Sequence, residues 1–144
     1  MDNLKWVVWF LMFAGFTSLP VAAGDFDGSQ PLLCAPIDVI ECTSGGQCQK
    51  VSAESIRLPQ FLRINFAEKK IGAASGGEGA PTTSIKTMEH IDGKLILNGA
   101  EDGIEGVRDG LGWSMAIAEE TGKMVLTASG DEVGFVVFGA CLAQ

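Results

Sequence analysis

The chain has 144 residues, of which 47% are hydrophobic, and a formal net charge of -8 at pH 7. Its Asp and Glu residues outnumber its Lys and Arg residues by 18 to 10, so it is poorly suited to bind phosphate backbones and we expect no nucleic-acid partner. An acidic surface attracts cationic partners, but it also serves simply to keep a protein soluble.

Residues 1–23 have the pattern of a secretory signal peptide. A short polar start, Met1–Lys5, precedes the apolar stretch Trp6–Phe16 and a segment that ends in Ala22-Ala23. The apolar stretch is much shorter than the roughly twenty residues that span a bilayer, so cleavage is favoured over an uncleaved anchor. We therefore predict a single β domain over residues 24–144 that is periplasmic or secreted, without stable membrane insertion after cleavage.

The four cysteines, Cys34, Cys42, Cys48 and Cys141, all lie in the part predicted to be exported. An even number in an oxidising compartment indicates two disulfides, for which three pairings exist. Cys42 and Cys48 flank a polar loop whose two glycines permit a local bridge, and that pairing leaves Cys34 to bond with Cys141. Four thiolates can also hold zinc, but the chain has no CxxC pair, so disulfides are favoured.

The first half of the predicted domain reads as short strands joined by turns. Side chains alternate along a strand, so Leu62, Ile64 and Phe66 are expected to share one face. Asp92-Gly93 is the strongest hairpin signal in the chain. The expected elements are strands at Leu32–Cys42, from Gln60, around Ile71–Ala74 and at Ser84–Ile91, helical turns at Ser52–Leu58, and a mobile loop at Ser75–Thr82.

A second irregular segment is expected over Gly99–Gly112. It contains Glu101, Asp102, Glu105 and Asp109 among five glycines. Their spacing follows neither an EF-hand nor a known repeat, so a solvated loop is favoured over a cation-binding loop, and we expect no metal and no cofactor. The four carboxylates remain candidate binding residues for a cationic partner.

The last third of the chain holds the clearest two-residue period. Trp113, Met115 and Ile117 alternate with small residues, so Trp113 is placed in the core in preference to a pocket or a binding edge. The run Glu132–Cys141 is the densest apolar stretch of the predicted domain and is expected to form a strand buried on both faces. Alternatively, the face that carries Phe138 marks a covered sheet or a dimer contact.

These elements predict an all-β fold. No helical pattern is long enough for a parallel crossover, so the strands are expected to form an antiparallel up-and-down meander. A bond between Cys34 and Cys141 brings the first strand beside the last, which closes the meander into a small barrel. A two-sheet sandwich cross-linked by the same bond is the alternative. A barrel of about eight strands is filled by side chains or holds one small ligand.

The chain shows little sign of catalytic chemistry. His90 is the only histidine, and Asp92 is two positions away in the sequence. A histidine oriented by an aspartate can act as a general base, but a solvated surface histidine is the favoured interpretation. No GxSxG, HExxH or P-loop motif is present, and the thiols are assigned to disulfides. We therefore predict that the protein is not an enzyme.

Several segments resemble those of small exported bacterial proteins: PLLCAP, ECTSGGQC, LPQFLRINF, DGKLIL, GWSMAI, TGKMVLTASG and GFVVFGAC. That likeness covers most of the predicted domain and implies no particular activity. In architecture alone, the expected domain is also similar to the periplasmic lysozyme inhibitors, which are small disulfide-containing antiparallel barrels, but their inhibitory motif is missing.

Two functions follow from this interpretation. The first is a protein-binding or inhibitory module of the bacterial envelope, which uses the acidic Gly99–Gly112 segment and the Ser75–Thr82 loop. The alternative is a carrier of a small apolar ligand inside a lipocalin-like barrel, lined by residues such as Trp113, Met115 and Phe66.

Overall fold

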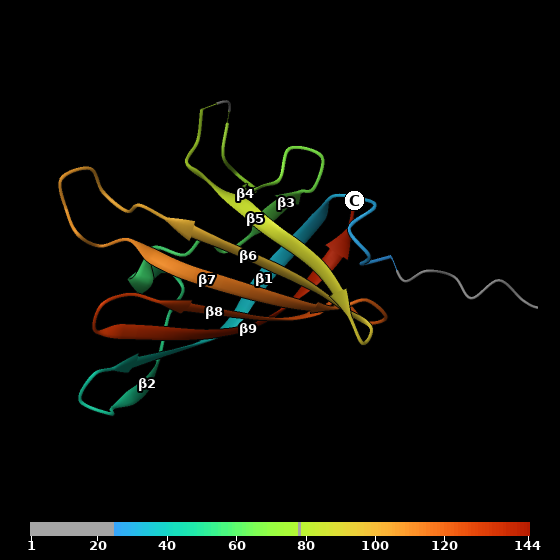
Figure 1. The fold of residues 1–144 in the computed structure, drawn as a ribbon. Helices are drawn as coiled ribbons and strands as arrows, with labels where there is room; N and C mark the ends of the chain where they lie inside the picture. Colours follow the sequence, from blue (N-terminus) through green and yellow to red (C-terminus); the bar gives the residue numbers. More distant parts are fainter. Residues whose placement is uncertain (1–24, 78) are drawn as a thin grey trace, which may run out of the picture.

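A computed structural model describes residues 25–77 and 79–144 (Figure 1). The predicted signal peptide, residues 1–23, lies outside the described residues. The elements are β1 (Leu32–Thr43), β2 (Cys48–Val51), the 3-10 helix η1 (Glu54–Ile56), β3 (Leu62–Asn65), β4 (Lys70–Ala73), β5 (Thr82–Ile91), β6 (Lys94–Glu101), β7 (Leu111–Ala118), β8 (Lys123–Ser129) and β9 (Val133–Ala143).

The strands form one antiparallel sheet that closes on itself. Their spatial order is β2-β1-β3-β4-β5-β6-β7-β8-β9, and β1 also pairs with β9. Strands β1 and β3–β9 therefore make an eight-stranded barrel, and β2 is an additional strand. The antiparallel meander is confirmed, and of the two predicted closures the barrel is the one formed (Figure 1).

The length of β1 allows this arrangement. One edge of β1 pairs with β9 from Leu32 to Thr43, with an irregularity between Pro36 and Asp38. The other edge is shared, because Leu32–Cys34 pair with β3 whereas Val39–Cys42 pair with β2. A single long strand thus closes the barrel and carries the small β1–β2 hairpin beyond it.

The core is built from inward-facing residues of the barrel strands, which alternate most clearly on β6, β7 and β8. On β7, Trp113, Met115 and Ile117 are all buried, as the two-residue period predicts. On the neighbouring β6, Leu95 and Leu97 are fully buried. Because inward positions on adjacent strands lie side by side, these residues stack across the barrel interior.

Local backbone geometry follows the turn chemistry of the sequence. Asp92 and Gly93 both have positive φ, 49° and 70°, which suits a two-residue hairpin between β5 and β6. The predicted helical turns at Ser52–Leu58 are reduced to η1, with the Ser55 backbone N–H donating to Ser52 Oγ at 3.2 Å. This helix ends at Arg57, which adopts a left-handed conformation with φ of 60°.

The segment predicted to be irregular over Gly99–Gly112 is shorter than expected. Strand β6 continues to Glu101 and β7 begins at Leu111, with Gly99 opposite Trp113. The prediction of these bounds was wrong because backbone pairing between two long strands does not require hydrophobic alternation at their ends. The loop itself spans residues 102–110, which we call the β6–β7 loop.

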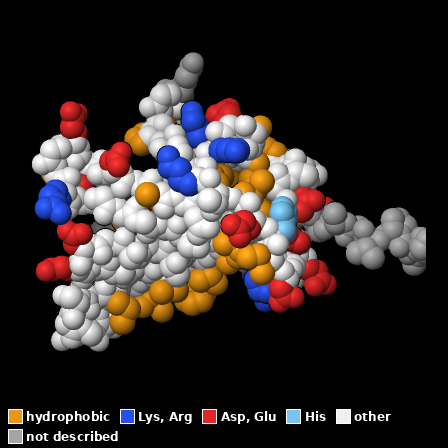
Figure 2. Space-filling view, viewed as in Figure 1, with side chains coloured by type: hydrophobic (Ala, Val, Ile, Leu, Met, Phe, Trp, Pro, Cys, Tyr) orange, Lys and Arg blue, Asp and Glu red, His pale blue; other side chains and the backbone are white. Residues whose placement is uncertain are grey.

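Strand β9 is not buried on both faces. Val137 faces the interior and is 1% exposed, whereas Phe138 is 43% exposed on the outer surface. The prediction was wrong because a barrel encloses only alternate residues, and a run of apolar letters does not reveal whether its second face is covered. Hydrophobic side chains form a band below β9 in the space-filling view (Figure 2).

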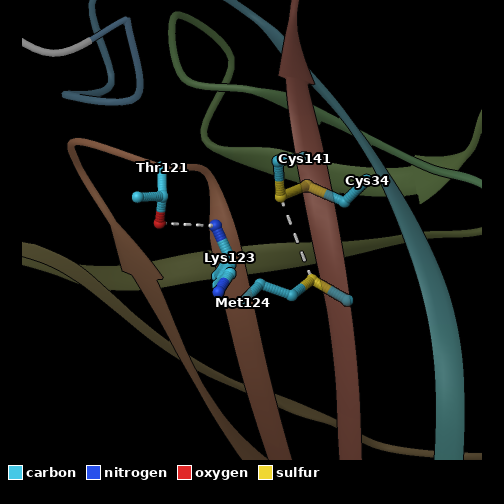
Figure 3. The surroundings of a disulfide bond; sticks show 5 residues. All are labelled: Cys34, Thr121, Lys123, Met124 and Cys141. Atoms are coloured by element: carbon cyan, nitrogen blue, oxygen red, sulfur yellow. Dashed lines mark hydrogen bonds between the residues drawn. A yellow bond between two sulfur atoms is a disulfide. The ribbon is translucent and has the colours of Figure 1, made fainter.

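Both predicted disulfides are formed, Cys34–Cys141 between β1 and β9 and Cys42–Cys48 between β1 and β2. All four thiols are thereby consumed, so the alternative zinc site is excluded. The Sδ atom of Met124 lies 3.9 Å from Cys141 Sγ, a close sulfur contact beside the buried bond (Figure 3). Two such bonds fit an exported protein.

Within residues 25–77 and 79–144, no helix has the length and apolar character needed to cross a membrane.

Candidate functional site

The two ends of the barrel differ, and one of them is plugged. At the end that carries the β5–β6 and β7–β8 turns, Phe26 and Phe66 pack against the core. A Cβ atom at Gly122 would lie 2.6 Å from Cε1 of Phe26, and one at Gly28 would lie 3.7 Å from Cδ1 of Phe66. The segment that precedes β1 therefore covers this end.

The opposite end holds a cavity of about 420 Å³. Residues from η1 and the segment after it, and from strands β3 to β9, form its walls. The side chains that line it are mostly apolar: Ile56, Leu58, Pro59, Leu62, Ile71, Ala73, Pro81, Leu111, Trp113, Met115, Leu126, Ala128, Phe135 and Val137, with Arg57, Thr82, Thr83 and Glu101 as the polar ones and Gly72 as the glycine. This volume falls in the range of roughly 300–1,000 Å³ that is typical of small-molecule sites.

Trp113 forms part of the deep wall. The side chain is 7% exposed, and its indole N–H donates a hydrogen bond to Thr83 Oγ1 at 3.0 Å. Among the described residues, no buried side-chain nitrogen or oxygen lacks a hydrogen-bond partner. The deep wall therefore offers apolar surface to a ligand and keeps its polar atoms paired within the protein.

The hydrogen bond between Trp113 and Thr83 can be tested directly. Thr83→Val keeps the side-chain shape but removes the acceptor, so we expect the free energy of unfolding to fall by about 1–2 kcal/mol. Urea denaturation followed by circular dichroism measures this change. Thr82→Val is the matched control, because Thr82 is exposed and lies one residue away on the same strand. Equal effects of the two substitutions would show that the indole does not depend on Thr83.

The mouth of the cavity is polar. Glu101 and Arg57 are the charged residues among those that line the cavity. In the β6–β7 loop, Asp109 Oδ1 accepts a hydrogen bond from the Ile104 backbone N–H at 2.8 Å, which holds the loop in shape. On η1, a hydrogen bond from the Gln60 side chain lowers the pKa of the Glu54 carboxyl, so Glu54 stays charged. Among the described residues, no three His, Cys, Asp or Glu side chains gather in a manner that could hold a metal ion.

The structure places the predicted binding residues in three different settings. Trp113 and Glu101 line the cavity, one at its wall and the other at its mouth. Asp102 and Glu105 are exposed on the β6–β7 loop, outside the lining. Asp109 is engaged within that loop, where its carboxylate accepts a hydrogen bond from the Ile104 backbone N–H.

Other expectations about the interior were only partly right. Met115 lines the cavity beside Trp113, but Phe66 packs at the opposite end, so its prediction as a lining residue was wrong. Sequence reasoning also missed Ile56 and Leu58, which contribute from η1 and the residues after it. No signal in the sequence marked them, because residues two apart do not share a face of a helix and the short segment has no apolar period.

His90 lies away from the cavity, at the plugged end next to the β5–β6 turn. Its Nδ1 atom is 2.6 Å from Glu119 Oε1 on the neighbouring turn. The Asp92 carboxylate instead lies 3.4 Å from Lys94 Nζ. None of the hydrogen bonds among the described residues joins His90 to Asp92, so the base-and-orienter arrangement considered from the sequence is not formed.

Comparison with known proteins gives no relative: no protein-family model, no curated protein and no solved structure matches this chain.

Proposed function

We propose that this protein is an exported binding protein that holds a small, largely apolar ligand in the cavity of its barrel. The observation that carries this proposal is the cavity of about 420 Å³ with a mostly apolar wall. Binding sites for small molecules are concave and mainly apolar, with a few polar groups that orient the ligand. Arg57, Thr82, Thr83 and Glu101 are such groups here.

The barrel supports binding because its walls are fixed before a ligand arrives. Every strand of the barrel is paired on both sides, and the Cys34–Cys141 disulfide joins the strands that close it. A preformed site loses little conformational entropy on binding, which raises affinity. Because Phe26 covers the other end, the ligand enters between η1 and the β6–β7 loop. We assign no catalytic step to these residues.

A second candidate function has one observation in its favour. Ile104 and Val107 are 51% and 53% exposed on the β6–β7 loop, next to the acidic side chains of the same loop. Apolar side chains that are exposed together mark protein contacts, and these two residues belong to one turn, in which the Val107 N–H donates to the Ile104 carbonyl oxygen. A protein-binding or inhibitory module of the bacterial envelope would use this loop and leave the cavity empty.

Filling the cavity separates the two functions. Ala128 lines the cavity between Trp113 and Phe135 on the adjacent strands, so Ala128→Trp places an indole in the space for the ligand. We expect the affinity for the neutral fluorescent probe N-phenylnaphthylamine to fall at least about a hundredfold, or about 2.7 kcal/mol. Titration of the probe fluorescence measures the dissociation constant.

The matched control is Ser129→Trp. Ser129 follows Ala128 on β8 but is exposed, so the same indole is added outside the barrel. This variant should bind the probe as the unaltered protein does. If Ala128→Trp folds and binds the probe equally well, the ligand site lies elsewhere and the proposed function fails.

A further inference from the structure

Charge is distributed unevenly between the two ends of the barrel. The loops at the cavity end carry no lysine among their described residues, whereas Lys69, Lys94 and Lys123 lie at or beside the turns of the plugged end. The turn after β8 adjoins the β6–β7 loop, because a Cβ atom at Gly130 would lie 3.8 Å from the Gly110 carbonyl oxygen. The carboxylates on these two segments and at the end of β6 are Glu101, Asp102, Glu105, Asp109, Asp131 and Glu132.

These carboxylates outnumber the guanidinium groups at the same end, which belong to Arg57 and Arg108. Acidic side chains accordingly dominate the left-hand end of the space-filling view, where the β6–β7 loop lies (Figure 2). Six carboxylates against two guanidinium groups leave an excess of negative charge on these segments, so the cavity opens beside a region of negative potential.

The interior adds a second requirement. Its deep wall is apolar and its polar atoms are already paired, so the inner part of a ligand must be apolar. The site therefore combines an apolar chamber with a mouth that favours positive charge.

We propose that the ligand of this cavity is a cationic amphiphile, such as an alkyl or aryl amine or a quaternary ammonium compound. Its apolar part fills the chamber, and its positive group lies at the mouth beside Glu101. This inference rests on the proposed function, since it assumes that the cavity binds a ligand. It adds the chemical class of that ligand, which the fold alone does not specify.

Arg57 is the one feature that favours an anion. It lines the cavity, and it forms none of the salt bridges found among the described residues. However, Arg57 is exposed, and its positive charge is offset by the negative charge of Glu101 in the same lining and by the carboxylates of the β6–β7 loop. Exposed single charges contribute little, whereas several charges of one sign determine the potential.

Three probes with the same alkyl chain test this inference: octyltrimethylammonium, octanol and octanoate. Isothermal titration calorimetry on the full-length protein gives each dissociation constant. We expect octyltrimethylammonium to bind about tenfold tighter than octanol, and octanoate to bind most weakly, because attraction and repulsion at the mouth act on the head group alone. Added salt should reduce the preference for the cation and leave octanol unchanged.

A rim variant and its matched control locate the effect. Glu101→Gln with Asp102→Asn and Glu105→Gln removes three charges at the mouth but spares Asp109, which holds the loop. We expect about tenfold weaker binding of octyltrimethylammonium and a much smaller change for octanol, because glutamine at position 101 still offers hydrogen bonds to a neutral head group. The control triple variant removes three exposed carboxylates elsewhere and should bind all probes normally: Glu68→Gln, Glu89→Gln and Glu120→Gln.

The results of these titrations distinguish a failure of the cationic-ligand inference from a failure of the proposed binding function. If all three probes bind equally, or if octanoate binds best, the ligand is not cationic and the inference is overturned, while the proposed function survives. If the rim and control variants weaken the binding of octyltrimethylammonium equally, the net charge of the protein and not the charge at the mouth causes the preference for cations. That result also overturns the inference. If octanol and the charged probes all fail to bind, the proposed function fails as well.

Discussion

Replacing Cys34 and Cys141 together with alanine is expected to lower the free energy of unfolding by about 4–5 kcal/mol. The disulfide links residues separated by 107 positions, so its loss greatly increases the conformational entropy of the unfolded chain. Both sulfur atoms also belong to the core, since Cys34 is fully buried and Cys141 is 9% exposed. Urea denaturation followed by circular dichroism measures the change.

The Cys42–Cys48 bond provides the internal control. It spans only 6 positions at the tip of the β1–β2 hairpin, where Cys48 is exposed. Its removal by the same double alanine substitution is expected to cost about 2 kcal/mol. If the short bond proves as important as the long one, the closure of the barrel is maintained by strand pairing and packing without help from Cys34–Cys141.

The pairing of the two disulfides could be predicted from the sequence. Four cysteines, one polar loop with two glycines and an exported context were enough to favour the correct pairing. The pairing in turn placed the first strand beside the last and favoured closure of the meander. A sandwich remained possible because a disulfide can join two strands that are not hydrogen-bonded to each other. The barrel requires β1 to pair with β9 along its length, and the cysteines alone do not predict that pairing.

Alternation predicted inward-facing residues well and outward-facing ones poorly. Trp113 and Met115 were placed in the interior because every second residue on β7 is large and apolar. Phe138 was misplaced because its neighbours are also apolar, so no polar residue marks the outer face of β9. The predicted end of β6 was too early because glycine is typical of loops. In the barrel, Gly99 lies within the strand, and its lack of a side chain allows the Trp113 ring to pack against the backbone.

The cavity itself could not be predicted from the sequence. Its walls combine Ile56, Thr83 and Phe135, which come from distant segments and meet only when the barrel closes. Whether side chains fill that space or leave it open depends on their relative orientation around the ring of strands. The acidic character of the mouth was partly visible in advance, because Glu101, Asp102, Glu105 and Asp109 are close in sequence.

Gly99 controls the position of the Trp113 side chain, and Gly99→Ala is expected to lower the free energy of unfolding by about 3 kcal/mol. A Cβ atom at this position would lie 2.2 Å from Cζ2 of Trp113 and 2.6 Å from the Ser84 carbonyl oxygen. The indole cannot retreat freely, since its N–H is bonded to Thr83 and the ring is buried. The added methyl group must therefore displace the ring, the neighbouring strand or both.

Gly112→Ala is the matched control, because Gly112 lies on the adjacent strand and a Cβ atom there would meet nothing within 4 Å. Its effect on unfolding is expected to stay within about 0.5 kcal/mol. Trp113→Leu should reduce the cost of Gly99→Ala in a double-mutant cycle, since the smaller side chain removes one of the two clashes. If Gly99→Ala is as mild as Gly112→Ala, the wall of the cavity is free to adjust, and the pre-formed shape on which the binding proposal depends is lost.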